Sequence, residues 1–328
     1  MTRTPRRTRT AALLAALAVP AAAQPEGEPL DIVFTHHSSA SNTFWQAVQR
    51  GFEDACGRIG AECQMIFTQT EGSIEQQAAN MQAALARGPD ALITSIVDNQ
   101  AFDAILQEAR DAGIVVIAAN VDDAEGAAGS ARQAFVGQGF VEAGRALAAA
   151  VAEGFPAEGP VNVLLGVSAP GQNWSEQRAQ GIEEGLRAWA EEAGREVAVE
   201  RIDSGTDLAV TADRVGAALA AAPDTTAYFD TGFWAAGVAR VLRDRGVEPG
   251  AVLMGAFDLV PEVLREMQAG YVQALVDQQP YAQGFLPVMQ AYLAHEIGLA
   301  PADVNTGTGV VRPEEVEAIL EGSQQGIR

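Results

Sequence analysis

The sequence predicts an α/β protein made of two doubly wound, parallel-sheet lobes. Short apolar runs alternate along the chain with amphipathic runs, as expected for parallel βαβ units. These units are too many for one hydrophobic core and about right for two. The length of 328 residues, with 48% hydrophobic and 20% charged residues, also suits two globular domains.

Residues 1–23 are predicted to form a secretory signal peptide. Four arginines between Arg3 and Arg9 precede the apolar run Ala11–Val19, and alanines supply the small residues for cleavage near Ala23. The apolar run is too short to span a bilayer. No cysteine stands at the cleavage site, so we expect a protein exported to the periplasm without a direct membrane anchor.

In the first half of the mature chain, strands and helices alternate without exception. The expected strands are 30–36, 63–68, 90–95 and 113–120, and the expected helices between them are 43–59, 73–87 and 99–112. After 134–137 the alternation begins again. The next helices are expected at 140–153, 175–193, 207–222 and 232–245, and the strands between them at 160–167, 196–203 and 226–230.

The charge of the chain excludes some classes of partner. The formal net charge is −22, the isoelectric point is near 4.4, and the chain contains no lysine. Nucleic-acid backbones and anionic membranes attract basic surfaces, so neither is expected as a partner.

The two cysteines, Cys56 and Cys63, follow one another across the end of the first helix and the start of the next strand. Export to an oxidising compartment permits a disulfide, which requires Cα atoms within about 7 Å. Two buried free thiols are the other possibility. His36, His37 and His295 show no metal-ligand spacing with these cysteines, so no metal is expected.

Two further strands end in polar residues. The strand 251–257 is followed by Asp258, with a helix close behind it, and the strand 271–276 is followed by Gln278. Pro280 suits the first turn of the next helix because it lacks an N–H group. Open α/β sheets bind ligands at the carboxyl ends of their strands, so Asp258 and Gln278 are expected to face one crevice.

The pattern FDxxPE at 257–262, followed by DQQPYAQG at 277–284, resembles the ribose- and galactose-binding branch of the periplasmic sugar-binding proteins of ABC importers. The resemblance covers nearly the whole mature chain. It implies the type I fold, in which three chain crossings form a three-strand hinge. The expected N-terminal lobe is 24–137 plus 279–308, and the C-terminal lobe is 138–278 plus 309–328.

The same resemblance implies a sugar site that begins with Asn42, Phe44 and Trp45. Aromatic faces cover the C–H side of a sugar ring, and an amide both donates to and accepts from hydroxyl groups. One of the two aromatic residues is expected to stack on the ligand and the other to be partly structural. His36 and His37 end the first strand, so one of them is expected to border the crevice. His36 is the preferred candidate, and a structural turn histidine is the alternative for each.

Other implied site residues lie further along the chain. Asn120 is favoured over Asp122 because it lies nearer the carboxyl end of its strand. Arg178 is expected to donate forked hydrogen bonds to sugar oxygens, with a surface ion pair as the alternative. Gln172 and Trp174 flank it.

One position departs from the ribose-type pattern. Where that branch carries Asn after the strand 226–230, this chain reads Asp230-Thr231. Thr231 or Asp230 is therefore expected to contact the ligand in place of the amide. This change puts identity with ribose or galactose specificity in doubt.

The function implied by the resemblance is capture of a neutral sugar, polyol or cyclitol between two closing lobes. The protein is expected to be a monomer that delivers its ligand to an ABC permease and its ATPase. Presentation of the closed form to a chemoreceptor or histidine kinase is the alternative. No cofactor is expected, and the chain carries none of the GxSxG, P-loop, HExxH or GxGxxG motifs that would favour an enzyme. A sugar-responsive repressor would need a DNA-binding element before residue 30.

Overall fold

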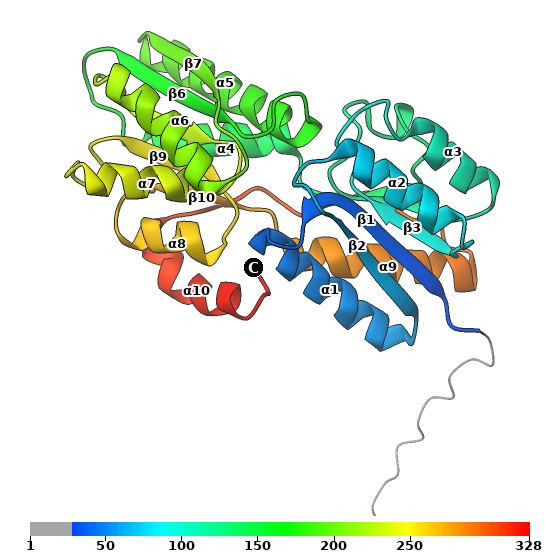
Figure 1. Cartoon of the computed structure of the whole chain (residues 1–328). Helices are drawn as coiled ribbons and strands as arrows, with labels where there is room; N and C mark the ends of the chain where they lie inside the picture. The colour runs from blue at the N-terminus through cyan, green and yellow to red at the C-terminus, as the bar shows by residue number, and fades with distance from the viewer. Residues whose placement is uncertain (1–27) are drawn as a thin grey trace, which may run out of the picture.

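A computed structural model describes residues 28–328 as two α/β lobes, each built on one six-stranded sheet (Figure 1). The predicted signal peptide, residues 1–23, lies outside the described residues. The α/β fold class predicted from the alternating pattern is confirmed. None of the helices in residues 28–328 is long and apolar enough to cross a membrane.

The N-terminal lobe is built on a parallel sheet with the strand order β11-β5-β4-β3-β1-β2. Helices α1 and α9 pack together on one face of this sheet, and α2 and α3 lie on the other (Figure 1). Its strands are β1 (Asp31–Ser39), β2 (Glu62–Thr68), β3 (Ala91–Thr94), β4 (Val115–Asn120), β5 (Ala134–Gly137) and β11 (Val304–Asn305). Its helices are α1 (Thr43–Ile59), α2 (Ile74–Leu85), α3 (Asp103–Asp111), α9 (Pro280–Ile297) and the 3₁₀ turn η1 (Gly126–Ala128).

The C-terminal lobe has the strand order β12-β10-β9-β8-β6-β7. All its pairings are parallel except that of β12 with β10, which is antiparallel. Its strands are β6 (Val161–Val167), β7 (Val197–Asp203), β8 (Ala227–Asp230), β9 (Leu253–Phe257), β10 (Ala274–Asp277) and β12 (Gly309–Val311). Its helices are α4 (Phe140–Ala152), α5 (Asn173–Ala193), α6 (Leu208–Ala221), α7 (Ala235–Asp244), α8 (Pro261–Gln268), α10 (Val316–Gln324) and the 3₁₀ turn η2 (Pro313–Glu315).

The chain passes between the two sheets three times. The passages lie between β5 and α4, between β10 and α9, and between β11 and β12. Gln138, in the first passage, donates from Nε2 to the carbonyl oxygens of Asp277 at 3.2 Å and Gly307 at 2.8 Å. One glutamine side chain therefore ties all three passages together.

Two predicted helix starts lie three or more residues from the starts in the structure. Helix α3 begins at Asp103 rather than residue 99, because the Asp98 carboxylate accepts from the N–H groups of Gln100 and Ala101 and holds a turn there. Helix α7 begins at Ala235 rather than residue 232, because Asp230 accepts from the N–H of Gly232. In both places a carboxylate satisfies backbone donors outside the helix.

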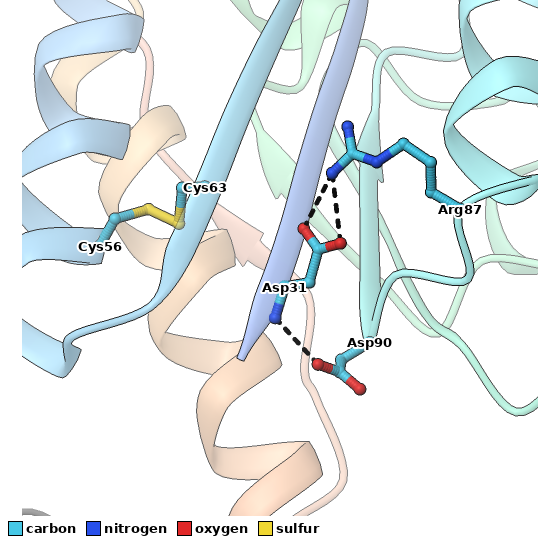
Figure 2. Close-up of a disulfide and its surroundings, with 5 residues drawn as sticks. All are labelled: Asp31, Cys56, Cys63, Arg87 and Asp90. Atoms are coloured by element: carbon cyan, nitrogen blue, oxygen red, sulfur yellow. Dashed lines mark hydrogen bonds and ion pairs between the residues drawn. A yellow bond between two sulfur atoms is a disulfide. The ribbon is translucent and has the colours of Figure 1, made fainter. Parts of the chain in front are cut away.

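Cys56 and Cys63 form a disulfide that joins the end of α1 to β2, with their Cα atoms 6.3 Å apart (Figure 2). In Figure 2 the carboxylate of Asp31, on the neighbouring strand β1, pairs with Arg87 at 3.2 Å. The bridge closes a short loop and holds the start of β2 close to the end of α1.

Removal of this bridge is expected to destabilise the N-terminal lobe. The Cys56→Ser/Cys63→Ser variant should lose about 2 to 3 kcal/mol, because a short disulfide loop restricts the unfolded chain by that amount. Denaturant titration of both proteins measures the loss, and a thiol count on the unreduced wild type should find no reactive thiol. Two reactive thiols would contradict the bridge.

Candidate ligand-binding site

A cavity of about 40 Å³ lies between the lobes, at the carboxyl ends of the strands of both sheets. Both lobes contribute polar and aromatic side chains to its wall. The N-terminal lobe provides His37, Ser38, Asn42, Phe44, Trp45, Glu71 and Asn120. The C-terminal lobe and the passage after β10 provide Phe140, Trp174, Arg178, Gly232, Phe233, Trp234, Asp258 and Gln278.

Arg178 is the cation of the cavity and is 3% exposed. Its guanidinium carbon lies 4.2 Å from the ring centre of Phe257 and 4.7 Å from that of Phe140, so aromatic faces replace water around the charge. Nη1 donates to the carbonyl of Thr231 at 2.8 Å, whereas Nε is buried without a hydrogen-bond partner. Within residues 28–328 the guanidinium forms no ion pair shorter than 4.0 Å.

Burial lowers the pKa of Arg178 to about 10, while the carboxylates of Asp258 and Asp230 act in the opposite direction. The group is still charged at neutral pH. A buried, charged guanidinium with a free donor is unfavourable unless a hydrogen-bond acceptor reaches it. Arg178 is therefore suited to bind an oxygen-rich ligand.

A chain of side-chain hydrogen bonds links the two lobes at the floor of the cavity. Asn120, at the end of β4, donates from Nδ2 to Oε1 of Gln278 at 3.2 Å and to Oε1 of Gln283 at 2.9 Å. Gln278 in turn donates from Nε2 to Oδ1 of Asp258. Burial raises the pKa of Asp258, and Arg178 and the Gln278 amide oppose that rise. The side-chain amides of Asn120 and Gln278 therefore hold the carboxylate of Asp258 in place at the cavity wall.

The backbone around this floor is strained at three places. Asn120 has a φ of 70°, Asp258 of 70° and Gln279 of 54°, and these are the non-glycine residues of the described chain with positive φ. Each follows or ends a strand, β4, β9 or β10. Such conformations cost about 1 to 3 kcal/mol and collect at functional sites. Asn and Asp tolerate them best, which agrees with their presence here.

Aromatic rings from both lobes form the cavity wall. Trp45 is stacked on His36, with ring centres 3.8 Å apart and an angle of 8° between the planes. His36 is fully buried under this ring and does not line the cavity, and its Nδ1 accepts from the N–H of Ser38 at 3.2 Å. Trp174 lies on the opposite lobe and donates from Nε1 to Gln172 at 2.8 Å.

The neighbouring His37 lines the cavity instead of His36. Its Nδ1 lies 3.0 Å from Oγ of Ser95. Burial lowers the pKa of His37 to about 4, Arg178 adds to the lowering, and Glu71 opposes it. The imidazole is therefore neutral at physiological pH and can donate to or accept from a hydroxyl group.

The neutral His37 makes stability depend on pH. Unfolded His37 binds a proton below its usual pKa of 6.5, whereas folded His37 binds one only near pH 4. Its contribution is complete above pH 6.5 and is lost as the pH falls towards 4. At 1.36 kcal/mol per pKa unit, the free energy of unfolding of the wild type should fall relative to His37→Gln by up to about 3 kcal/mol across this window.

Denaturant titrations of both proteins at pH 4, 5, 6 and 7 measure this difference. Burial raises the pKa of Asp230 to about 6, which favours the folded state as the pH falls. Asp230 is present in both proteins, so its effect cancels in the comparison. A difference between the two proteins that does not change with pH would contradict the lowered pKa of His37.

Both polar atoms of the Asn42 side chain form hydrogen bonds within the protein. Its Oδ1 caps α1 by accepting from the N–H of Phe44 at 3.1 Å, and its Nδ2 donates to Glu71 at 2.9 Å. Glu71 also accepts from Oγ of Ser38 and from the N–H of Ser39, both at 2.8 Å. Glu71 therefore holds the turn that presents Asn42, Phe44 and Trp45.

Neither of the two candidates at the end of β8, Asp230 and Thr231, lines the cavity. Asp230 accepts from the hydroxyl of Tyr228 at 2.5 Å and from the N–H of Gly232 at 2.8 Å. Thr231 accepts through Oγ1 from the N–H of Ser168 at 2.9 Å. Both are fully buried, and the next residues, Phe233 and Trp234, line the cavity in their place.

Two other predicted residues lie outside the cavity wall. Asp122 pairs with Arg132 at 2.5 Å, and Arg132 also pairs with Asp303 at 2.7 Å. Gln172 donates from Nε2 to the carbonyl of Gly72 on the other lobe at 2.9 Å. Among residues 28–328, no cluster of His, Cys, Asp and Glu could hold a metal ion.

The predicted residues that do line the cavity are Asn42, Phe44, Trp45, Asn120, Trp174, Arg178, Asp258 and Gln278. Sequence reasoning missed Phe233 and Trp234, although they follow a strand end as Asp258 does. It also missed Phe140 and Glu71, and of the two neighbouring histidines it preferred His36 to His37. Phe140 directly follows the first passage between the lobes, whereas nothing in the sequence marks Glu71.

Two α/β lobes around a cavity at the strand ends, joined by three passages of the chain, define a two-lobed solute-binding protein. The chain belongs to the family described as the periplasmic binding protein domain, whose profile matches residues 32–298. Its fold and relatives are those of sugar-binding proteins of ABC transporters rather than of enzymes.

Several known proteins are similar to this chain. The xylose/arabinose-binding protein XylF of Sulfolobus acidocaldarius is 26% identical over 315 residues, covering 92% of this chain and 75% of XylF. A carbohydrate transporter of Acidothermus cellulolyticus in complex with myo-inositol superposes with a TM-score of 0.79 at 24% identity, covering 92% and 100%. The Caulobacter myo-inositol binding protein superposes with a TM-score of 0.78 at 24% identity, covering 90% and 97%.

Proposed function

We propose that this protein captures one neutral monosaccharide, polyol or cyclitol between its lobes. The observation that carries the proposal is the charge arrangement of the cavity. The buried cation Arg178 and the buried carboxylate Asp258 both line it, yet they form no direct ion pair. A polyhydroxylated molecule can accept hydrogen bonds from the guanidinium of Arg178 and donate hydrogen bonds to the carboxylate of Asp258 at the same time.

The aromatic wall of the cavity supports the same class of ligand. Phe44 and Trp45 from one lobe, and Trp174 and Trp234 from the other, offer flat apolar surfaces to the C–H groups of a ring. The named ligands of the similar proteins, xylose or arabinose and myo-inositol, belong to this class.

The proposed use of the captured ligand is delivery to an ABC permease and its ATPase in the periplasm, after signal cleavage near Ala23. The moving bodies are residues 24–137 plus 279–308 and residues 138–278 plus 309–328. The membership of the two sheets and the three passages between them support this division. Ligand contacts to both lobes would shift the population towards the closed form.

Thermal unfolding of the mature protein tests the proposal. The protein is first refolded to remove carried-over ligand and is then heated with pentoses, hexoses, alditols and cyclitols in turn. A ligand at 100 times its dissociation constant should add about 2.7 kcal/mol to the free energy of unfolding. A rise in melting temperature with one or a few members supports the proposal, and no rise across the whole panel contradicts it.

A further inference from the structure

The first turn of α5 makes polar contacts with the opposite lobe. The backbone N–H of Asn173 donates to the carbonyl of Val97 at 2.9 Å. Its Nδ2 lies 3.1 Å from the carbonyl of Ile96, 2.7 Å from Oδ1 of Asn99 and 3.3 Å from the carbonyl of Asp122. All these acceptors belong to the N-terminal lobe, whereas α5 belongs to the C-terminal lobe.

Gln172, one residue earlier, reaches a fifth acceptor on the N-terminal lobe. Its Nε2 donates to the carbonyl of Gly72, and its Oε1 accepts from Nε1 of Trp174. Gln172 and Asn173 are each 8% exposed, and neither lines the ligand cavity. These contacts between the lobes therefore do not involve the proposed ligand.

The first turn of α5 has a backbone N–H group that finds its acceptor on the other lobe. The first N–H groups of an α-helix have no partner inside the helix, and a capping side chain usually accepts from them. Gln172 occupies the cap position of α5 without such a bond. The N–H of Asn173 instead reaches Val97 across the lobe boundary. When the lobes separate, this donor must turn to water.

Another part of the lobe boundary is far less closed. A cleft of about 610 Å³ lies there, and its wall includes Thr43 and Thr70 from one lobe and Leu208 and Glu262 from the other. Across this cleft the hydroxyl of Thr43 donates to the carboxylate of Glu262 at 3.5 Å. The lobes are thus joined tightly at the start of α5 and loosely at this cleft.

We propose that Gln172 and Asn173 form a latch that favours the closed arrangement of the lobes without ligand contact. Their cross-lobe hydrogen bonds exist only when the lobes meet, so they change the ratio of closed to open protein. That ratio in turn scales the apparent affinity for any ligand that needs the closed form. The inference rests on the two-lobe closure of the proposed function, but not on the identity of the ligand.

The test measures the distance between the lobes in the ligand-free protein. Cysteines introduced as Thr70→Cys and Val210→Cys, both exposed and on opposite lobes, carry nitroxide labels for pulsed EPR. The native cysteines are paired and should not react. Asn173→Ala should lower the closed-to-open ratio about tenfold, which corresponds to 1.4 kcal/mol, about the net contribution of a buried hydrogen bond.

Asn80→Ala is the matched control. Its Nδ2 donates to the carbonyl of Phe67 at 3.2 Å within one lobe, so the same substitution should leave the distance distribution unchanged. Asn173→Ser replaces the amide with a shorter polar side chain that cannot reach the same acceptors. It should repeat the opening, and it guards against a folding defect in the alanine variant. Distance distributions equal to that of the wild type in both Asn173 variants would overturn the latch. Because the measurement contains no ligand, failure of the sugar panel would not affect its outcome.

Discussion

Arg178→Met is expected to weaken binding of the best ligand at least 100-fold. Methionine fills the slot between Phe140 and Phe257 with a chain of similar length but supplies no donor. Hydrogen bonds to a charged group contribute about 1.5 to 3 kcal/mol each, and the loss of two corresponds to a factor of at least 100. Isothermal titration with the sugar that gives the largest thermal shift measures the change.

Two further variants show whether the loss of binding comes from the loss of the guanidinium or from a disturbed fold. Arg187 is exposed on the same helix, so Arg187→Met should bind like the wild type. Arg178→Lys keeps the charge but not the planar fork, and it should fall between the two. Circular dichroism and melting without ligand show whether each variant is folded. A folded Arg178→Met protein with wild-type affinity would remove Arg178 from the site.

Part of this site could be predicted because strand ends in an α/β sheet have predictable positions. Asn120, Asp258 and Gln278 each follow an apolar strand, and the structure brings them into one hydrogen-bonded chain. The same rule could not decide the residues at the end of β8. Asp230 ends this strand and Thr231 follows it, but Tyr228 and Ser168 lie close enough to form hydrogen bonds with their polar atoms.

The remaining differences come from contacts between residues distant in sequence. Arg132 forms ion pairs with both Asp122 and Asp303. The alternating pattern gives no sign that these three residues lie together. Gln172 contacts Gly72, 100 residues away on the other lobe. Periodicity places elements in order, whereas the partners of a polar side chain depend on how the two lobes meet.

Glycines at helix contacts are a further property that periodicity does not reveal. Helices α4 and α5 approach so closely that a Cβ on Gly144 would lie 2.4 Å from the carbonyl oxygen of Arg178 and 2.8 Å from the nitrogen of Ile182. A Cβ on Gly181 would lie 2.2 Å from the carbonyl oxygen of Val141. The backbone position of Arg178 thus depends on the missing side chain of Gly144.

Gly144→Ala is therefore expected to disturb both stability and binding. The added methyl group meets backbone rather than a flexible side chain, so α5 must shift. Overpacking of this kind costs about 3 kcal/mol, which exceeds the helix propensity of about 1 kcal/mol gained by replacing glycine. Denaturant titration measures the stability, and titration with the ligand should show weaker binding because Arg178 moves with its helix.

Gly57→Ala is the same substitution in another helix, and its expected effect on the free energy of unfolding is the opposite. Gly57 is exposed on α1, and a Cβ there would have no atom within 4 Å. It should therefore stabilise the protein by up to about 1 kcal/mol and leave binding unchanged. If Gly144→Ala also stabilised the protein, the close approach of α4 and α5 would not be what seats Arg178. A loss of stability at Gly144 alone would instead tie the ligand site to the close packing of α4 against α5, which carry the cavity residues Phe140 and Arg178.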